Sequence, residues 1–78
     1  MLKYKLVENN DVFVTYRYFP DGEEIYGEIK VSKSSKQIIQ SKVASNDEFR
    51  WCFLKMYKRI KKFIEDDAFR KDGMIAWY

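Results

Sequence analysis

Few side chains in this chain could do covalent or acid–base chemistry. There is no histidine, so the commonest general base and metal ligand is missing, together with every Ser–His or Cys–His nucleophile pair. The single cysteine, Cys52, falls at the edge of an apolar helical pattern, where a free cysteine is typically a small buried hydrophobic residue. We therefore interpret Cys52 as structural and expect no catalytic residue.

Carboxylates cluster at two places. Asp21, Glu23 and Glu24 cluster beside a turn but lack the spacing of an EF-hand loop, which favours a solvated loop. Asp66 and Asp67 are adjacent, and neighbours on a helix point about 100° apart, which favours capping over paired acid–base work. The sequence therefore predicts a protein that is not an enzyme and has no metal site and no cofactor.

One candidate binding surface is a face of the predicted sheet on which cations alternate with aromatic residues. Cations that track phosphates and rings on which bases stack are typical of single-stranded nucleic-acid binding. The candidate nucleic-acid-binding residues are Lys3, Lys5, Phe13, Arg17, Tyr26 and Lys30. The alternative is that the C-terminal tail or a second subunit covers this face.

The other candidate surface is the outer face of the predicted helix. Trp51 and Leu54 point away from the apolar stripe and lie among lysines that include Lys58. Tryptophan is enriched at interface hot spots, so its exposure needs a partner. We predict a homodimer whose self-association residues are Trp51, Leu54 and Lys58, and single-stranded nucleic acid is the alternative partner.

Both surfaces depend on an α+β fold. We predict a four-stranded antiparallel meander followed by one long amphipathic helix and a short apolar C-terminal tail. The 78 residues are enough for a single domain, 1–78, with strands at about 2–43, the helix at about 46–65 and the tail at 66–78.

The strands follow from a period of two, since Leu2, Tyr4 and Leu6 alternate with lysines. A turn is predicted at Pro20-Asp21-Gly22 because proline presets φ and glycine accepts a positive φ. The predicted core face of the sheet consists of Leu2, Tyr4, Leu6, Val12, Val14, Tyr16, Tyr18, Ile25, Ile29 and Val31.

The helix is predicted to begin at a capping box of Ser45 and Glu48. Its sheet-facing stripe is predicted to consist of Phe49, Cys52, Phe53, Met56, Tyr57, Ile60, Phe63 and Ile64. After Gly73 the tail is apolar, and we expect it to dock, with Ile75 and Trp77 covering core surface.

Composition agrees with a folded, mildly basic protein, with 46% hydrophobic residues and a net charge of +3. A lone cysteine cannot form an internal disulfide. The first ten residues hold no apolar run typical of a signal peptide, and no stretch approaches the roughly 20 apolar residues of a membrane span. We therefore expect a cytoplasmic protein with no membrane partner.

Four strands followed by a helix, with a Pro-Asp-Gly loop inside residues 12–31, resemble single-stranded-DNA-binding domains of the transcriptional-coactivator type. The resemblance is one of topology, covers residues 2–64, and carries over no functional residue. It implies a dimer whose curved sheets grip the strand. The segment Tyr16-Arg17-Tyr18-Phe19-Pro20 and the ending Trp77-Tyr78 also resemble small bacterial proteins of unknown function.

Overall fold

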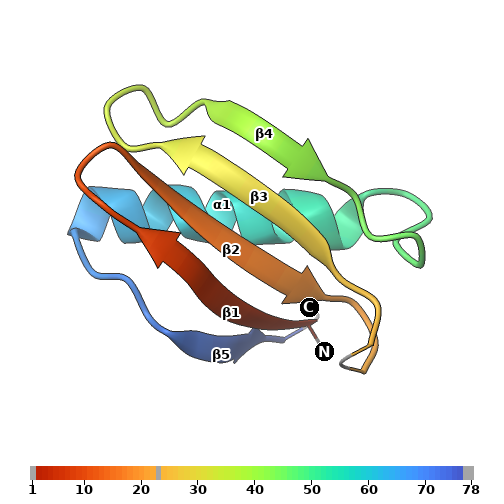
Figure 1. Ribbon diagram of the computed structural model, residues 1–78. Helices are drawn as coiled ribbons and strands as arrows, with labels where there is room; N and C mark the ends of the chain where they lie inside the picture. The colour runs from red at the N-terminus through yellow and green to blue at the C-terminus, as the bar shows by residue number, and fades with distance from the viewer. Residues whose placement is uncertain (1, 23, 77–78) are drawn as a thin grey trace.

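An antiparallel sheet with one helix across a single face forms the protein (Figure 1). The computed structural model describes residues 2–22 and 24–76. Its elements in chain order are β1 (Leu2–Asn9), β2 (Phe13–Phe19), β3 (Gly27–Ser32), β4 (Ile38–Lys42), α1 (Trp51–Asp66) and β5 (Asp72–Ile75). The strand order across the sheet is β4-β3-β2-β1-β5. The predicted α+β class is therefore confirmed.

The prediction of four strands is wrong, because the described part of the chain forms five. The apolar tail supplies β5, which pairs antiparallel with β1 and brings Ile75 opposite Leu2. The amide of Leu6 also donates to the carbonyl of Lys71, 2.7 Å from N to O, just before β5 begins. Ile75 is buried beside the core, whereas Trp77 and Tyr78 lie outside the described residues.

The core lies between the inner face of the sheet and α1. The helix directs Cys52, Phe53, Met56, Ile60 and Phe63 into it. The inner face of the sheet contributes Leu2, Tyr4, Val14, Tyr16, Tyr18, Ile29 and Val31.

Two residues predicted for the core are outside it, since Val12 is 66% exposed and Ile25 is 43% exposed. Val12 precedes β2 and Ile25 precedes β3, so the period of two does not extend to them.

Two tyrosines of the inner face each lie over a glycine of the neighbouring strand. Tyr18 pairs with Gly27 and Tyr4 pairs with Gly73 in the strand register. A Cβ at Gly27 would overlap the Tyr18 ring, and a Cβ at Gly73 would lie 2.7 Å from Cζ of Tyr4. These glycines therefore give the tyrosine rings room to lie flat along the sheet.

The helix begins later than the sequence predicts. Ser45 and Glu48 form no capping box, because both precede α1, whose N-cap is Arg50 in a left-handed conformation with φ 58°. The orphan amides of the first turn are bound by the buried carboxylate of Asp47 instead. Phe49, predicted for the buried stripe, is 74% exposed because it lies in the loop before the helix.

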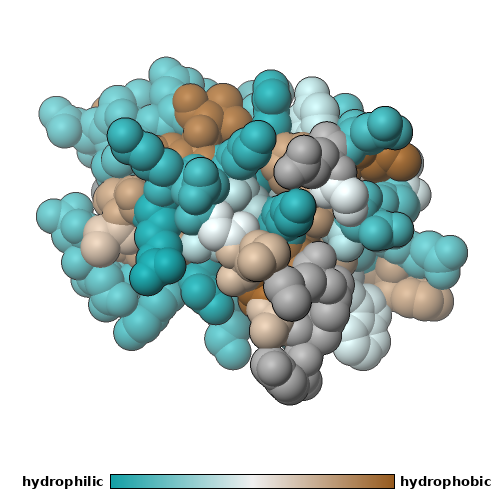
Figure 2. Space-filling model, turned by 90° about the horizontal axis from the view of Figure 1, so that it is seen from below, coloured by the Kyte–Doolittle hydropathy of each residue, from teal (hydrophilic) through white to brown (hydrophobic). Residues whose placement is uncertain are grey.

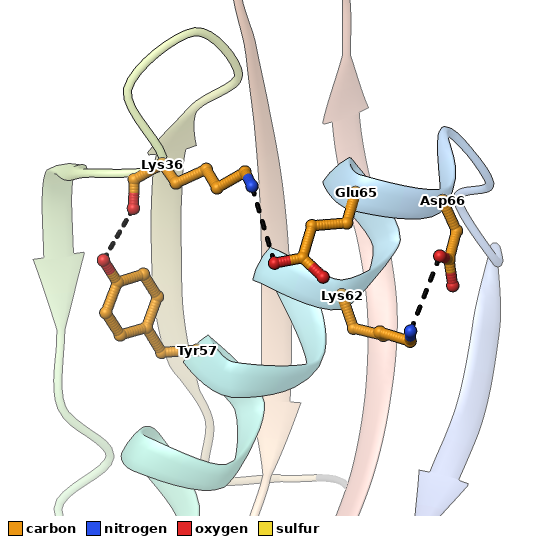
Figure 3. A network of polar contacts seen from close by, with 5 residues as sticks. All are labelled: Lys36, Tyr57, Lys62, Glu65 and Asp66. Carbon is orange, nitrogen blue, oxygen red and sulfur yellow. Dashed lines mark hydrogen bonds and ion pairs between the residues drawn. The ribbon is translucent and has the colours of Figure 1, made fainter.

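The β3–β4 turn is tied to the middle and the end of α1. Lys36, in a left-handed conformation, accepts a hydrogen bond from Tyr57 Oη at its carbonyl oxygen, 2.6 Å away. Its ammonium lies 3.5 Å from a carboxylate oxygen of Glu65 (Figure 3). The hairpin tip and the helix are thus held together by polar contacts at the edge of the core.

Candidate functional site

The strand register places the predicted nucleic-acid-binding residues on the outer face of the sheet, with Tyr26 just before β3. Lys3 lies opposite Phe19, Lys5 opposite Arg17, and Lys30 opposite Thr15. The helix lies on the other face, so α1 does not cover these residues (Figure 1).

The rings on this face are already in contact with cations. The ammonium of Lys30 lies 3.9 Å from the ring centre of Phe13. Arg17 and Lys42 lie 4.6 and 5.0 Å from the ring centre of Tyr26. A base that stacks on the same face of one of these rings must displace a cation that gains about 0.5 to 2 kcal/mol from its position.

The charge of the outer face is mixed. Glu8, Glu28 and Asp72 lie on it beside the cations, and Arg17 pairs with Glu28 at 3.1 Å. Three hollows of about 310, 300 and 390 Å³ cross this face, and each is lined by at least one carboxylate. This mixture of charges is poorly suited to a uniformly anionic backbone.

The predicted self-association residues lie together on the outer side of α1. Trp51 is 63% exposed and Leu54 is 60% exposed, and their spacing of three residues makes them neighbours on the helix surface. Lys58 follows one turn later and is exposed. Phe49, which the sequence assigned to the core, adds a further exposed ring just before the helix.

A groove between α1 and β5 was not predicted. It has a volume of about 550 Å³ and is lined by Lys55, Lys58, Arg59, Lys62, Phe63, Asp66 and Ile75. The cations of this groove could be found from their helical spacing in the sequence. The contribution of Ile75 to the groove could not be found in the sequence, because β5 was not recognised as a strand.

Cys52, Asp66 and Asp67, which the sequence singles out as candidate nucleophile, acid or base, each have a structural environment. Burial, and after it the nearby Asp47 carboxylate, raise the pKa of the Cys52 thiol to about 11, so the thiol is protonated at neutral pH. Asp66 pairs with Lys62, and Asp67 forms the left-handed cap of the helix. Within residues 2–22 and 24–76, no three His, Cys, Asp or Glu side chains gather as a metal site would require.

Comparison of the chain with protein-family models, with curated proteins and with solved structures finds no match. The topological resemblance to single-stranded-DNA-binding domains therefore stays a prediction. Among the described residues, no helix has the length and apolar character needed to cross a membrane.

Proposed function

We propose that this protein is a non-enzymatic interaction module that associates with a second copy of itself through the exposed face of α1. The observation that carries the proposal is the pair Trp51 and Leu54, which are adjacent on the helix and mostly exposed. The proposal places the protein in the cytoplasm, where a free thiol such as Cys52 stays reduced.

The core has no need of these two side chains. The opposite side of α1 already fills the space against the sheet with Phe53, Met56 and Ile60. Burying a large apolar side chain contributes about 1.5 to 3 kcal/mol. In a monomer Trp51 and Leu54 stay mostly exposed, so most of this contribution is absent. A partner that covers both would recover it.

A second copy suits this surface because it can be self-complementary. In a twofold arrangement the same patch is used by both copies, so Trp51 of one chain can pack on Leu54 of the other. If the two helices cross in antiparallel directions, Lys58 of one copy approaches the start of the other helix. The exposed carboxylate of Glu48 lies there, and the opposite charges favour this arrangement.

Single-stranded nucleic-acid binding at the outer sheet face is the weaker candidate. Cations already contact its rings, and carboxylates lie beside its cations.

Sedimentation equilibrium over low to high micromolar protein tests the proposal. We expect the wild type to dimerise at both low and high salt, because the contact is mainly apolar. Trp51→Lys should be monomeric and should lose the dependence of its melting temperature on concentration. A wild-type chain that stays monomeric at high micromolar concentration contradicts the proposal.

Ile39→Ser is the matched control, since Ile39 is 53% exposed on the edge strand β4. It removes a comparable exposed apolar side chain and should leave the dimer intact. Dissociation of Ile39→Ser instead of Trp51→Lys would move the interface to the free edge of β4.

A further inference from the structure

The groove between α1 and β5 is lined mainly by basic residues. Lys55, Lys58, Arg59 and Lys62 line it, and Asp66 is the one carboxylate among the described residues that line it. Figure 2 views the molecule from the β5 side and shows mainly hydrophilic side chains on the left half, where α1 ends. Phe63 and Ile75, both buried, give the groove an apolar floor.

The cations form a row rather than a cluster. Lys55, Arg59 and Lys62 are spaced by four and three residues, so they fall on one side of the helix. With a helical rise of about 1.5 Å per residue, the row extends for about 10 Å along α1. A row of this kind suits a chain of anionic groups better than one small anion.

The carboxylate of Asp66 does not block the groove. Asp66 lies 3.6 Å from the ammonium of Lys62, and both side chains are more than half exposed. An exposed ion pair of this kind contributes about 0 to 1 kcal/mol, so an incoming phosphate can replace the carboxylate at little cost.

We propose that this groove binds the phosphodiester backbone of a single nucleic-acid strand. The row is long enough for a few phosphates of one strand. The apolar floor between α1 and β5 can then contact the sugars. A flat lipid surface would meet Lys58 on the outer rim but would not reach the floor beside Ile75. The proposal does not rest on Trp51 or Leu54, although the groove shares Lys58 with the proposed self-association surface.

Fluorescence anisotropy with labelled oligo-dT and oligo-U tests the site. We expect binding at low salt, with log affinity falling linearly in log salt. Arg59→Gln with Lys62→Gln should weaken binding about tenfold and reduce the salt slope by about 1.4, because each phosphate that a cation neutralises on a single strand adds about 0.7 to the slope. Lys62→Gln alone, at an exposed position outside the self-association surface, is a second variant in case Arg59 is needed for folding, and it should reduce the slope by about 0.7.

Lys5→Gln with Lys30→Gln is the matched control, because it removes the same charge from the outer sheet face. This variant should change the affinity by less than about twofold, which is on the order of measurement error, because the proposed site does not include Lys5 or Lys30. An equal decrease in affinity in both double variants would show attraction by net charge alone and overturn the proposal. So would the absence of binding at low salt, or binding to phosphatidylserine vesicles without binding to either oligonucleotide.

Discussion

The carboxylate of Asp47 accepts a hydrogen bond from the amide of Phe53, 2.9 Å from N to Oδ2, and so caps a helix that begins only at Trp51. Its other oxygen accepts from the amide of Cys52 at 3.1 Å. The hydroxyl of Tyr18 donates to the same carboxylate at 3.4 Å and accepts from the amide of Ala44 at 3.0 Å. Asp47 therefore links the loop, the helix and the sheet.

Asp47→Ala should destabilise the protein by about 2 to 3 kcal/mol, because it leaves two buried amides without their charged acceptor. Ser45→Ala is the control two residues away. Ser45 is exposed and precedes the helix, so its replacement should change the free energy of unfolding by less than about 0.5 kcal/mol. Urea unfolding measures both, and a larger effect at Ser45 than at Asp47 would restore the capping box predicted from the sequence.

Cys52 should react slowly with a thiol reagent in the folded protein and rapidly in denaturant, since its side chain is buried. Rapid labelling of the native protein would show that the thiol is accessible.

The raised pKa of Cys52 also makes stability depend on pH. The thiol ionises near pH 9 when unfolded and near pH 11 when folded, so its contribution is full below about pH 9 and is lost as pH rises through 11. Tyr18, whose pKa is raised to about 12 chiefly by burial, adds a loss in the same direction at higher pH. Between pH 8 and 11 the free energy of unfolding should fall less steeply with pH for Cys52→Ala than for the wild type, because unfolding of the variant releases about one proton fewer.

Ile75 and Met74 are neighbours on opposite faces of β5, and this allows a matched test of the docked tail. Ile75 is 8% exposed and Met74 is 57% exposed. Ile75→Ala should cost about 2 to 4 kcal/mol, whereas Met74→Ala should stay within about 0.5 kcal/mol. Equal melting temperatures for Ile75→Ala and the wild type would mean that β5 is not part of the cooperative unit in solution.

The C-terminal cap of α1 offers a stabilising substitution. Asp67 has φ 50°, and its amide and that of Ala68 bond back to Ile64 and Phe63 as in a Schellman motif. Asp67→Gly should stabilise the protein by about 0.5 to 1 kcal/mol, because glycine adopts this φ freely and a negative charge leaves the negative end of the helix dipole. Asp67→Asn, which removes the charge and keeps a Cβ, should recover only part of the gain in thermal unfolding. A destabilised Asp67→Gly would mean that the carboxylate has a role of its own.

Much of the sheet could be predicted because strand patterns are local. The alternation of Leu2 and Tyr4 with lysines gives the two faces of β1, and the same period places Arg17 and Lys30 on the outer face. β5 could not be predicted from its own residues, since Asp72-Gly73-Met74-Ile75 is short and contains a glycine that strands usually avoid. Its position depends on pairing with the distant β1.

The start of the helix was mispredicted for a related reason. Ser45 and Glu48 fit a capping box, but it is Asp47 that is buried and accepts a hydrogen bond from the hydroxyl of Tyr18, which lies in β2. Of the surfaces, the exposed pair Trp51 and Leu54 follows from helical spacing alone. The cation contacts of Phe13 and Tyr26 and the contribution of Ile75 to the apolar floor of the basic groove arise only when remote segments meet.

The pairing of Leu2 with Ile75 joins residues that are far apart in the sequence in one ladder. During translation the chain must therefore emerge from the ribosome as far as Ile75 before β5 can pair with β1. Until then β1 has one free edge, and Leu2 lacks the side chain that pairs with it across that edge. The nascent chain thus has an open strand edge while the segments between β1 and β5 are made. A chaperone or a neighbouring nascent chain could bind to this edge before β5 forms.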